Sequence, residues 1–202
     1  MTASDAIVHV VDDDVAIRDS LGWLLRSRGV QARAFESGEA FLAEIADFPR
    51  GCVVLDVRMD GMSGFEVFEA MLARGLRIPV IFLTGHADVP LAVAALKKGA
   101  FDFLEKPFND NELVDRVLGA MRCDEAAWHQ REAQASVEAR LALLTSRERE
   151  VMELVLAGEY NKTIADRLAI AVRTVEVHRA RVFEKMGVSS AVELAQVVGA
   201  KR

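Results

Sequence analysis

The strongest constraint on the fold is a regular alternation in the first 122 residues. Short apolar runs rich in β-branched residues are each followed by a helical pattern. Unbroken apolar runs are typical of strands buried on both faces, and their alternation with helices predicts a parallel sheet covered on both sides. The sequence therefore predicts a doubly wound five-stranded α/β domain over residues 1–122. Its strands are expected at residues 6–11, 30–35, 52–56, 79–84 and 101–105.

Helix start and stop signals separate the predicted strands. Ser37 precedes the second helical pattern as an N-cap, and Asn109 with Glu112 has the spacing of a capping box before the fifth. Gly29 and Gly99 follow the first and fourth helical patterns, where glycine favours the helix end. The fourth helix is expected from about residue 88 to 98. Each predicted strand is thus followed by a helix of its own.

The rest of the chain has only helical signals. Residues 123–139 lack Gly and Pro and are rich in Ala, Glu, Gln and Arg, which predicts a helical linker continuous with the fifth helix. Residues 140–202 predict an all-α domain of four helices. Thr145 with Glu148 forms a capping box for the first, Asn161 is the expected cap of a short second helix, and the third runs from about 173 to 186. Ser190 is the expected cap of the fourth.

Charge is distributed unevenly between these parts. Residues 1–122 hold 13 Lys and Arg against 19 Asp and Glu, whereas residues 138–202 hold 11 against 9. An acidic first part and a mildly basic last part indicate two modules with different partners, the second suited to nucleic acid.

Several classes of protein are disfavoured by what the sequence lacks. No apolar run reaches the roughly 18–20 residues of a membrane span, and the first residues do not resemble a signal peptide. Cys52 and Cys123 are too few for a disulfide framework and are expected to be thiols. We therefore expect a cytoplasmic protein with no membrane partner. The histidines show no metal-binding spacing; they are His9, His86, His129 and His178.

Polar side chains follow four of the predicted strands. Asp12 and Asp13 follow the first, Asp56 ends the third, Thr84 ends the fourth, and Lys106 follows the fifth. The carboxyl ends of parallel strands meet at one edge of the sheet. Crowded carboxylates need a divalent cation, and Mg²⁺ prefers oxygen ligands, while an ammonium and a hydroxyl suit phosphoryl oxygens. The pattern predicts a site where one carboxylate attacks phosphorus, although each residue alone could be a turn, a cap or a solvated charge.

These segments resemble a known family. The stretches VVDDD (10–14), LDVRMDGMSG (55–64), LTGHADVPLAVAALKKGA (83–100) and FDFLEKPF (101–108) are similar to response-regulator receiver domains, especially the FixJ branch, over about residues 5–122. The resemblance implies a flavodoxin-like sheet of strand order 2-1-3-4-5. It also implies that Asp56 accepts a phosphoryl group from a sensor histidine kinase.

The resemblance further assigns roles around Asp56. It implies that Asp13, Asp56 and the backbone carbonyl of Arg58 hold Mg²⁺, with Asp12 assisting. It implies that Lys106 contacts the phosphoryl group and that the Lys106–Pro107 peptide is cis. Thr84 and Phe103 resemble the family's switch pair, in which the hydroxyl moves to the phosphoryl group and the ring turns inward; by position alone, Phe103 could equally be core.

One residue departs from the family pattern in the loop after the acceptor. Asp60 stands where the family usually has Pro. The change frees the backbone and adds a carboxylate, so we hypothesise a more mobile loop and an altered lifetime of the phosphoryl group.

The last part resembles a second family. Residues 144–188 are similar to the LuxR/FixJ-type four-helix DNA-binding domain, in which residues 161–180 would form a helix-turn-helix. The resemblance implies that Glu176 and Val177 face base edges in the major groove. The further candidates for phosphate or base contact are Lys162, Thr174, His178, Arg179 and Arg181.

Two positions in this domain leave alternatives open. His178 could instead be a half-buried helix residue. Ala171 stands where the family commonly has Ser before the third helix, and the loss of a hydroxyl cap costs roughly 1 kcal/mol. Thr174 could take over part of the capping.

Together the two resemblances predict a phosphorylation-dependent transcriptional regulator rather than an enzyme. Phosphorylation of Asp56 would pair two receivers and place two helix-turn-helix units on a two-fold related site in promoter DNA, with RNA polymerase as a further partner. The only chemistry expected is Mg²⁺-dependent phosphorylation and dephosphorylation at Asp56. Two alternatives remain: a phosphoryl-relay protein whose last part contacts proteins, and a DNA binder with a vestigial receiver.

Overall fold

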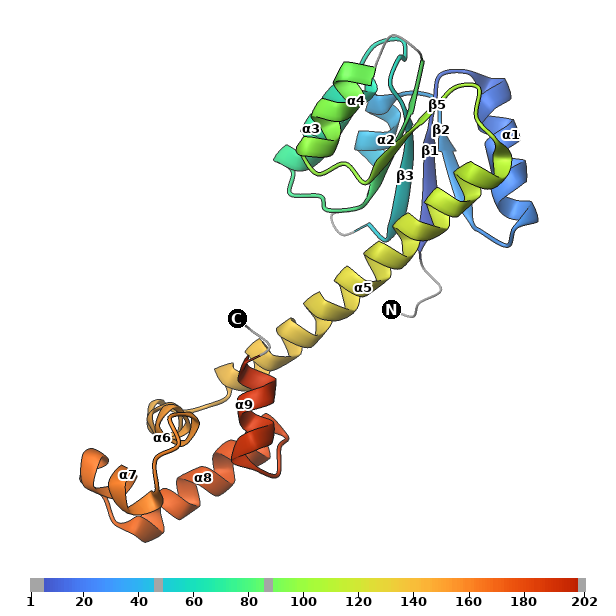
Figure 1. Cartoon of the computed structure of the whole chain (residues 1–202). Helices are drawn as coiled ribbons and strands as arrows, with labels where there is room; N and C mark the ends of the chain where they lie inside the picture. The colour runs from blue at the N-terminus through green and yellow to red at the C-terminus, as the bar shows by residue number, and fades with distance from the viewer. Residues whose placement is uncertain (1–5, 46–48, 86–88, 200–202) are drawn as a thin grey trace. The chain divides into compact units, whose positions relative to one another are not determined.

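The computed structural model describes residues 6–45, 49–85 and 89–199 of the 202-residue chain. The chain forms two compact units that divide after Trp128. The first unit contains a sheet and the second is helical, as the sequence predicts (Figure 1).

In the described residues of the first unit, the sheet has five parallel strands. They are β1 (Ile7–Val11), β2 (Ala32–Phe35), β3 (Gly51–Asp56), β4 (Val80–Thr84) and β5 (Asp102–Glu105). Their order is β2-β1-β3-β4-β5, which confirms the predicted order. All of β3 and β4 is buried, as expected for central strands between two helical layers.

Helices cover both faces of this sheet (Figure 1). One core lies under α1 (Val15–Ser27) and the first turns of α5 (Asp110–Ala142) and includes Leu25 and Leu113. The other lies under α2 (Gly38–Glu44), α3 (Gly64–Ala73) and α4 (Val89–Lys97). The predicted first residue of α4, Asp88, lies outside the described residues, as does His86.

Local signals explain most of the helix ends. Ser37 caps α2 by accepting from the Ala40 N–H, and Gly29 and Gly99 have φ of 74° and 100° after α1 and α4. The fifth helix differs from the prediction. Asn109 accepts from the Asn111 N–H at 2.8 Å, while the Glu112 carboxylate pairs with Arg116, its neighbour one turn along.

A buried ion pair closes the amino end of β3. The Arg50 Nε donates to Asp124 Oδ2 at 2.7 Å, and the Gly51 N–H donates to the same oxygen at 3.0 Å. The two side chains are only 8% and 1% exposed, and the guanidinium lies 4.5 Å from the centre of the Trp128 ring. Residues 124–128, which lie in the predicted linker, therefore pack on the sheet domain.

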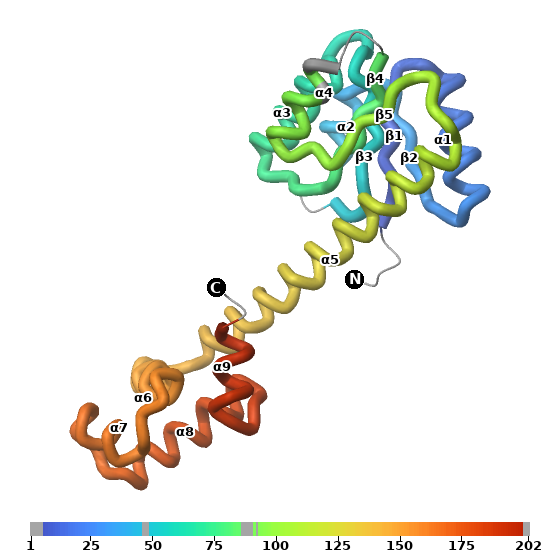
Figure 2. Tube along the Cα trace, viewed as in Figure 1, coloured from blue at the N-terminus to red at the C-terminus, as the bar shows by residue number. Residues whose placement is uncertain are grey.

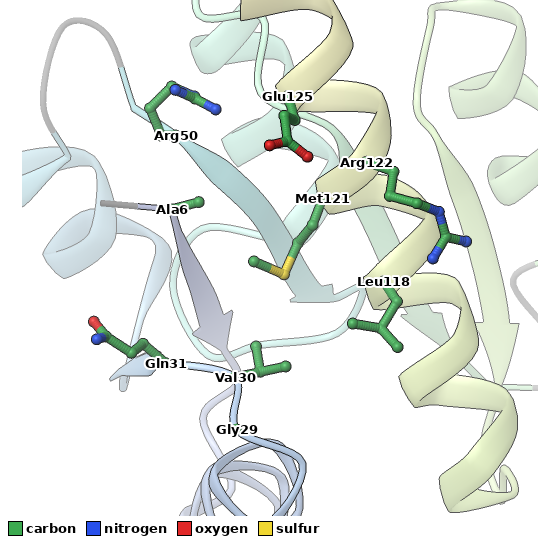
Figure 3. Close-up of a pocket in the computed structure, with 9 residues that line it drawn as sticks. All are labelled: Ala6, Gly29, Val30, Gln31, Arg50, Leu118, Met121, Arg122 and Glu125. Atoms are coloured by element: carbon green, nitrogen blue, oxygen red, sulfur yellow. The ribbon is translucent and has the colours of Figure 1, made fainter. Parts of the chain in front are cut away.

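A surface hollow of about 380 Å³ adjoins this ion pair. Figure 3 shows the Met121 side chain extending from α5 between Ala6 and Val30, with Glu125 one turn further along the helix. The amino end of the sheet is therefore only partly covered by α5. The ion pair of Arg50 and Asp124 holds α5 against the sheet beside this hollow.

Within residues 129–199, the described part of the second unit, four helices follow the end of α5, as predicted; Figure 2 shows their course. They are α6 (Ser146–Leu156), α7 (Asn161–Leu168), α8 (Val172–Met186) and α9 (Ala191–Gly199). One apolar core joins them, and on α8 it includes Val175, Val182 and Met186. Thr145 and Glu148 form the predicted capping box at the start of α6.

The start of α7 corrects one prediction. Tyr160, not Asn161, occupies the N-cap position, and it makes no side-chain capping bond. Asn161 is the first helical residue, and its side chain accepts from Arg179 of α8 at 2.6 Å. The sequence pattern correctly placed Asn161 at the start of the helix, but it could not show that Asn161 bonds to Arg179 on another helix.

Candidate functional site

Three carboxylates meet at the carboxyl edge of the sheet. Asp12 and Asp13 follow β1 and Asp56 ends β3, and one oxygen of each lies within 4.8 Å of the others. Asp12 and Asp56 are buried, whereas Asp13 is exposed. The parallel register of β1 and β3 brings these residues together, because Val11 is paired with Leu55, one residue before the carboxylates.

A lysine from the end of β5 enters the same cluster. The Lys106 Nζ lies 2.9 Å from Asp12 Oδ2 and 2.9 Å from Asp56 Oδ1. Its backbone N–H donates to the Thr84 carbonyl at 2.8 Å, which fixes where the side chain departs. The following Lys106–Pro107 peptide is cis, which agrees with the sequence prediction.

The charges of the cluster are unbalanced. Burial raises the pKa of Asp56, and repulsion from Asp12 and Asp13 adds to the rise, while Lys106 acts in the opposite direction. Burial alone would lower the pKa of Lys106, but its bonds to Asp12 and Asp56 raise it. Three carboxylates and one ammonium leave an excess of negative charge. A divalent cation with oxygen ligands, such as Mg²⁺, fits this donor set.

The predicted switch residues lie on the neighbouring strands β4 and β5. Thr84 ends β4 and is buried, and its hydroxyl donates to the Gly85 carbonyl at 2.8 Å. Phe103 lies on β5, half-buried, against the core under α2, α3 and α4. Phe103 thus packs against the core, the alternative that the sequence left open for it.

The loop after Asp56 contains a bond that sequence reasoning missed. The Asp60 N–H donates to Asp13 Oδ2 at 2.9 Å. A proline at this position would have no N–H to donate. Arg58 is exposed in the same loop. Gly64 starts α3 so close to Asp56 that a Cβ there would lie 2.1 Å from the Asp56 carbonyl oxygen, so only glycine fits.

The second unit exposes a row of polar and apolar side chains on α8. Thr174, Glu176, Val177 and Arg181 are all exposed, as is Lys162 on α7. Glu176 accepts from Arg173 at 3.2 Å, one turn back on the same helix. These residues from the predicted DNA-binding set are therefore available to a partner.

Two other predicted contact residues are held within the unit. Arg179 donates to Asn161 at 2.6 Å and lies 5.6 Å from the centre of the Phe183 ring. His178 is half-buried, and within the described residues its Nδ1 atom is buried without a hydrogen-bond partner. Arg179 fastens α8 to the start of α7, a role the sequence did not reveal.

Comparison with known families follows the division seen in the fold. Residues 8–118 match the response regulator receiver domain, and residues 142–198 match the bacterial regulatory proteins of the luxR family. The chain belongs to the two-component response regulators. Its receiver carries the carboxylate cluster, and its LuxR-type domain carries the exposed face of α8.

Similar proteins extend the match to the whole chain. A C4-dicarboxylate transport transcriptional regulatory protein, DctR of Rhodobacter capsulatus, is 55% identical over 94% of this chain and 98% of its own length. The transcriptional regulatory protein FixJ of Bradyrhizobium diazoefficiens is 45% identical, covering 94% of this chain and 93% of its own.

A solved structure gives the same result. The response regulator StyR superposes with a TM-score of 0.91 at 39% identity, covering 96% of this chain and 98% of its own. The response regulator described here is thus a transcriptional regulator of the FixJ and DctR type. Within the described residues, no helix is both long and apolar enough to cross a membrane.

Proposed function

We propose that Asp56 is the phosphorylation site and that its phosphorylation controls DNA binding by α8. The observation that carries the proposal is the placement of Lys106 between Asp12 and Asp56 in a cluster of three carboxylates. This arrangement holds the Asp56 carboxylate, whose side chain is 10% exposed, beside a cation at the end of a buried strand.

The transfer follows from the chemistry of these groups. An Asp56 carboxylate oxygen attacks the phosphorus of a phosphohistidine on a sensor kinase, an O–P bond forms, and the N–P bond breaks with the imidazole as leaving group. Asp13, Asp56 and the Arg58 carbonyl would hold Mg²⁺, with Asp12 assisting, and the ion would neutralise charge on the phosphoryl oxygens. Lys106 then exchanges its bond to Asp56 for one to the new phosphoryl group.

The switch is proposed to run through Thr84 and Phe103. The Thr84 hydroxyl leaves the Gly85 carbonyl for a phosphoryl oxygen, and the Phe103 ring turns into the space that it vacates. The face formed by α4, β5 and α5 changes with it. Leu91 and Val93 on α4 are 49% and 42% exposed, and the face formed by α4, β5 and α5 is proposed to pair two phosphorylated receivers.

The kinase is proposed to dock beside the acceptor. A largely apolar hollow of about 440 Å³ adjoins Lys106, between α1 and the start of α5. Its rim includes the exposed Ser20. Ser20→Arg should therefore slow transfer from a sensor kinase that phosphorylates the wild type, yet leave phosphorylation by phosphoramidate unchanged; equal rates with the kinase would contradict this docking place.

The DNA-bound state is proposed to place one α8 from each protomer in successive major grooves. Glu176 and Val177 would read bases, with Thr174 and Arg181 on the same exposed helix. Lys162 supplies a phosphate contact from α7. Promoter DNA and RNA polymerase are the proposed partners, and the cytoplasm the proposed location.

The proposal is tested by mass spectrometry of the intact chain with phosphoramidate and Mg²⁺. We expect one added phosphoryl group in the wild type and none in Asp56→Asn. A duplex-DNA gel shift in the same reactions should strengthen on phosphorylation and weaken steeply with salt. Phosphorylation that persists in Asp56→Asn would overturn the assignment of the site.

The Asp60 departure gives a second test at this site. Asp60→Pro removes the N–H that donates to Asp13 and should change the rate at which the phosphoryl group is lost. The measurement is the decay of phosphorylated protein after removal of the donor, and identical decay rates in the two proteins would rule out a role for this bond.

A further inference from the structure

Two helix C-termini come together in the second unit. The interdomain helix α5 ends at Ala142, and α8, which carries the exposed DNA-binding residues, ends at Met186. Arg140, in the last turn of α5, donates to the Met186 carbonyl at 2.8 Å. In return, Lys185 of α8 donates to the Leu143 carbonyl, just beyond α5, at 3.1 Å. Each helix end thus receives a proton donor from the other.

These hydrogen bonds offset the electrostatic repulsion between the two helix C-termini. Each helix C-terminus carries about half a negative charge on its unsatisfied carbonyls, so two adjacent ends repel. Arg140 and Lys185 place cations between them, and Arg149 adds a third by donating to the Leu141 carbonyl at 2.8 Å. The contact between the helix ends therefore depends on these side chains.

Each of the two crossing cations is held in place by a second partner. Arg140 also donates to the Ser136 Oγ at 3.0 Å, one turn back on α5. Lys185 donates to the buried Glu148 at 2.7 Å, and this bond, together with hydrogen bonds from Thr145, lowers the pKa of Glu148 to about 2. Neither side chain can rotate away without losing a further bond.

The residue after α8 is a glycine that lies next to Arg140. Gly187 has φ of 65°, a left-handed conformation that favours glycine at the end of a helix. A Cβ at this position would lie 3.4 Å from Arg140 Nη1, which is an ordinary van der Waals distance. The guanidinium therefore packs against the turn that ends α8.

We propose that Arg140 is a positioning residue for DNA recognition. It holds the C-terminal end of α8 against the last turn of α5, so that the direction of α8 is set by α5 and a change in α5 reaches the DNA-reading residues. The proposal rests on the proposed function in one respect: α8 is taken to be the helix that reads DNA.

The test uses the full-length chain and fluorescence anisotropy. The probes are a duplex that the wild type selects from a randomised library and a shuffled duplex of the same length, each measured with and without Mg²⁺ and beryllofluoride. Arg140→Ala is compared with Arg140→Lys, which keeps the charge. Arg122→Ala is the matched control, because Arg122 is an exposed arginine of α5 in the first unit.

We expect Arg140→Ala to lose about tenfold in affinity for the selected duplex, from the loss of a charge-assisted hydrogen bond, and to bind the shuffled duplex as the wild type does. The strengthening produced by beryllofluoride should also fall to a small fraction of its wild-type value. Arg140→Lys should retain most of the affinity for the selected duplex and most of the strengthening by beryllofluoride. Arg122→Ala should match the wild type in both measurements.

A purely structural role has a different signature. If Arg140→Ala keeps wild-type selectivity and response to beryllofluoride, or loses affinity for both duplexes equally, the proposal is overturned. Circular dichroism at the assay temperature checks folding, and Arg140→Gln, a neutral donor, replaces the alanine variant if that one unfolds. If beryllofluoride does not change DNA binding by the wild type, the proposed control by phosphorylation is wrong. The comparison of the selected and shuffled duplexes still decides the role of Arg140.

Discussion

The receiver site and the exposed face of α8, which we propose reads DNA, are built in opposite ways. In the receiver, Asp12, Asp56 and Thr84 are buried and Lys106 bonds to both carboxylates, so each functional group is fixed by its neighbours. On α8, Thr174 and Val177 point into solvent from a well-packed helix. A site that performs chemistry needs its geometry before the reaction, whereas a reading surface obtains its partners from the DNA.

This contrast predicts that single charge deletions cost far more inside the receiver than on its surface. Arg50→Ala would leave Asp124 buried without its principal cation and should lower the free energy of unfolding by about 3–5 kcal/mol. The matched control is Arg33→Ala, because Arg33 forms a half-exposed pair with Glu44 that is worth about 0–1 kcal/mol. Urea unfolding followed by tryptophan fluorescence measures both, and equal losses would break the contrast.

The next largest effect is expected in the site itself. Lys106→Ala removes the cation shared by Asp12 and Asp56, so phosphorylation by phosphoramidate should slow by about 10²-fold. Lys98→Ala is the control, since Lys98 makes a surface pair with Glu69. Rates come from intact mass spectra over time. A Lys106→Ala protein that reacts as fast as the control would show that the cluster does not depend on its lysine.

Acid should lower the free energy of unfolding of the receiver through His9. Burial and then the charge of Arg33 lower the pKa of His9 from 6.5 to about 4, so the folded receiver keeps this histidine neutral. The unfolded chain takes up a proton below pH 6.5, so this stability is full above pH 6.5 and is lost as the pH falls towards 4. We expect a loss of about 2 kcal/mol after allowance for partial exposure.

The measurement is urea unfolding at pH 7 and pH 5 for the wild type and His9→Leu. The variant should lose less stability on acidification, whereas His129→Gln, on the exposed part of α5, should behave as the wild type. If all three proteins lose the same free energy of unfolding between pH 7 and pH 5, His9 does not titrate as its burial requires.

The smallest effect is expected on the DNA-binding side. Ala171 occupies the N-cap of α8 and makes no side-chain capping bond, so Ala171→Ser should stabilise this unit by about 1 kcal/mol. Thermal melting followed by circular dichroism would detect the gain. A decrease in the melting temperature would show that the serine side chain cannot reach the free N–H groups of the first turn.

Much of the fold and of the receiver site could be predicted because the signals are local. The strands β1, β3 and β4 are largely apolar runs, and Asp12, Asp13, Asp56 and Thr84 lie where those runs end. Parallel topology then brings them together without any knowledge of side-chain conformation. The cis peptide before Pro107 came from resemblance and is present.

The missed features depend on long-range partners. No local pattern links Arg50 to Asp124, 74 residues away, because the pair requires α5 to continue past the sheet. The bond from Asp60 to Asp13 uses a backbone N–H, which side-chain patterns do not reveal. Asn161 has the composition of a cap, but its acceptor is used by Arg179 from another helix.

The pair of Arg50 and Asp124 has a practical consequence for chimeric regulators. A hybrid joined at residue 122, where the receiver pattern ends, would take Arg50 from one parent and residue 124 from the other. A parent without an acid at that position would leave a stranded guanidinium inside the hybrid. Domain exchange should therefore cut after Trp128, so that both members of the pair, and the ring beside them, are inherited together.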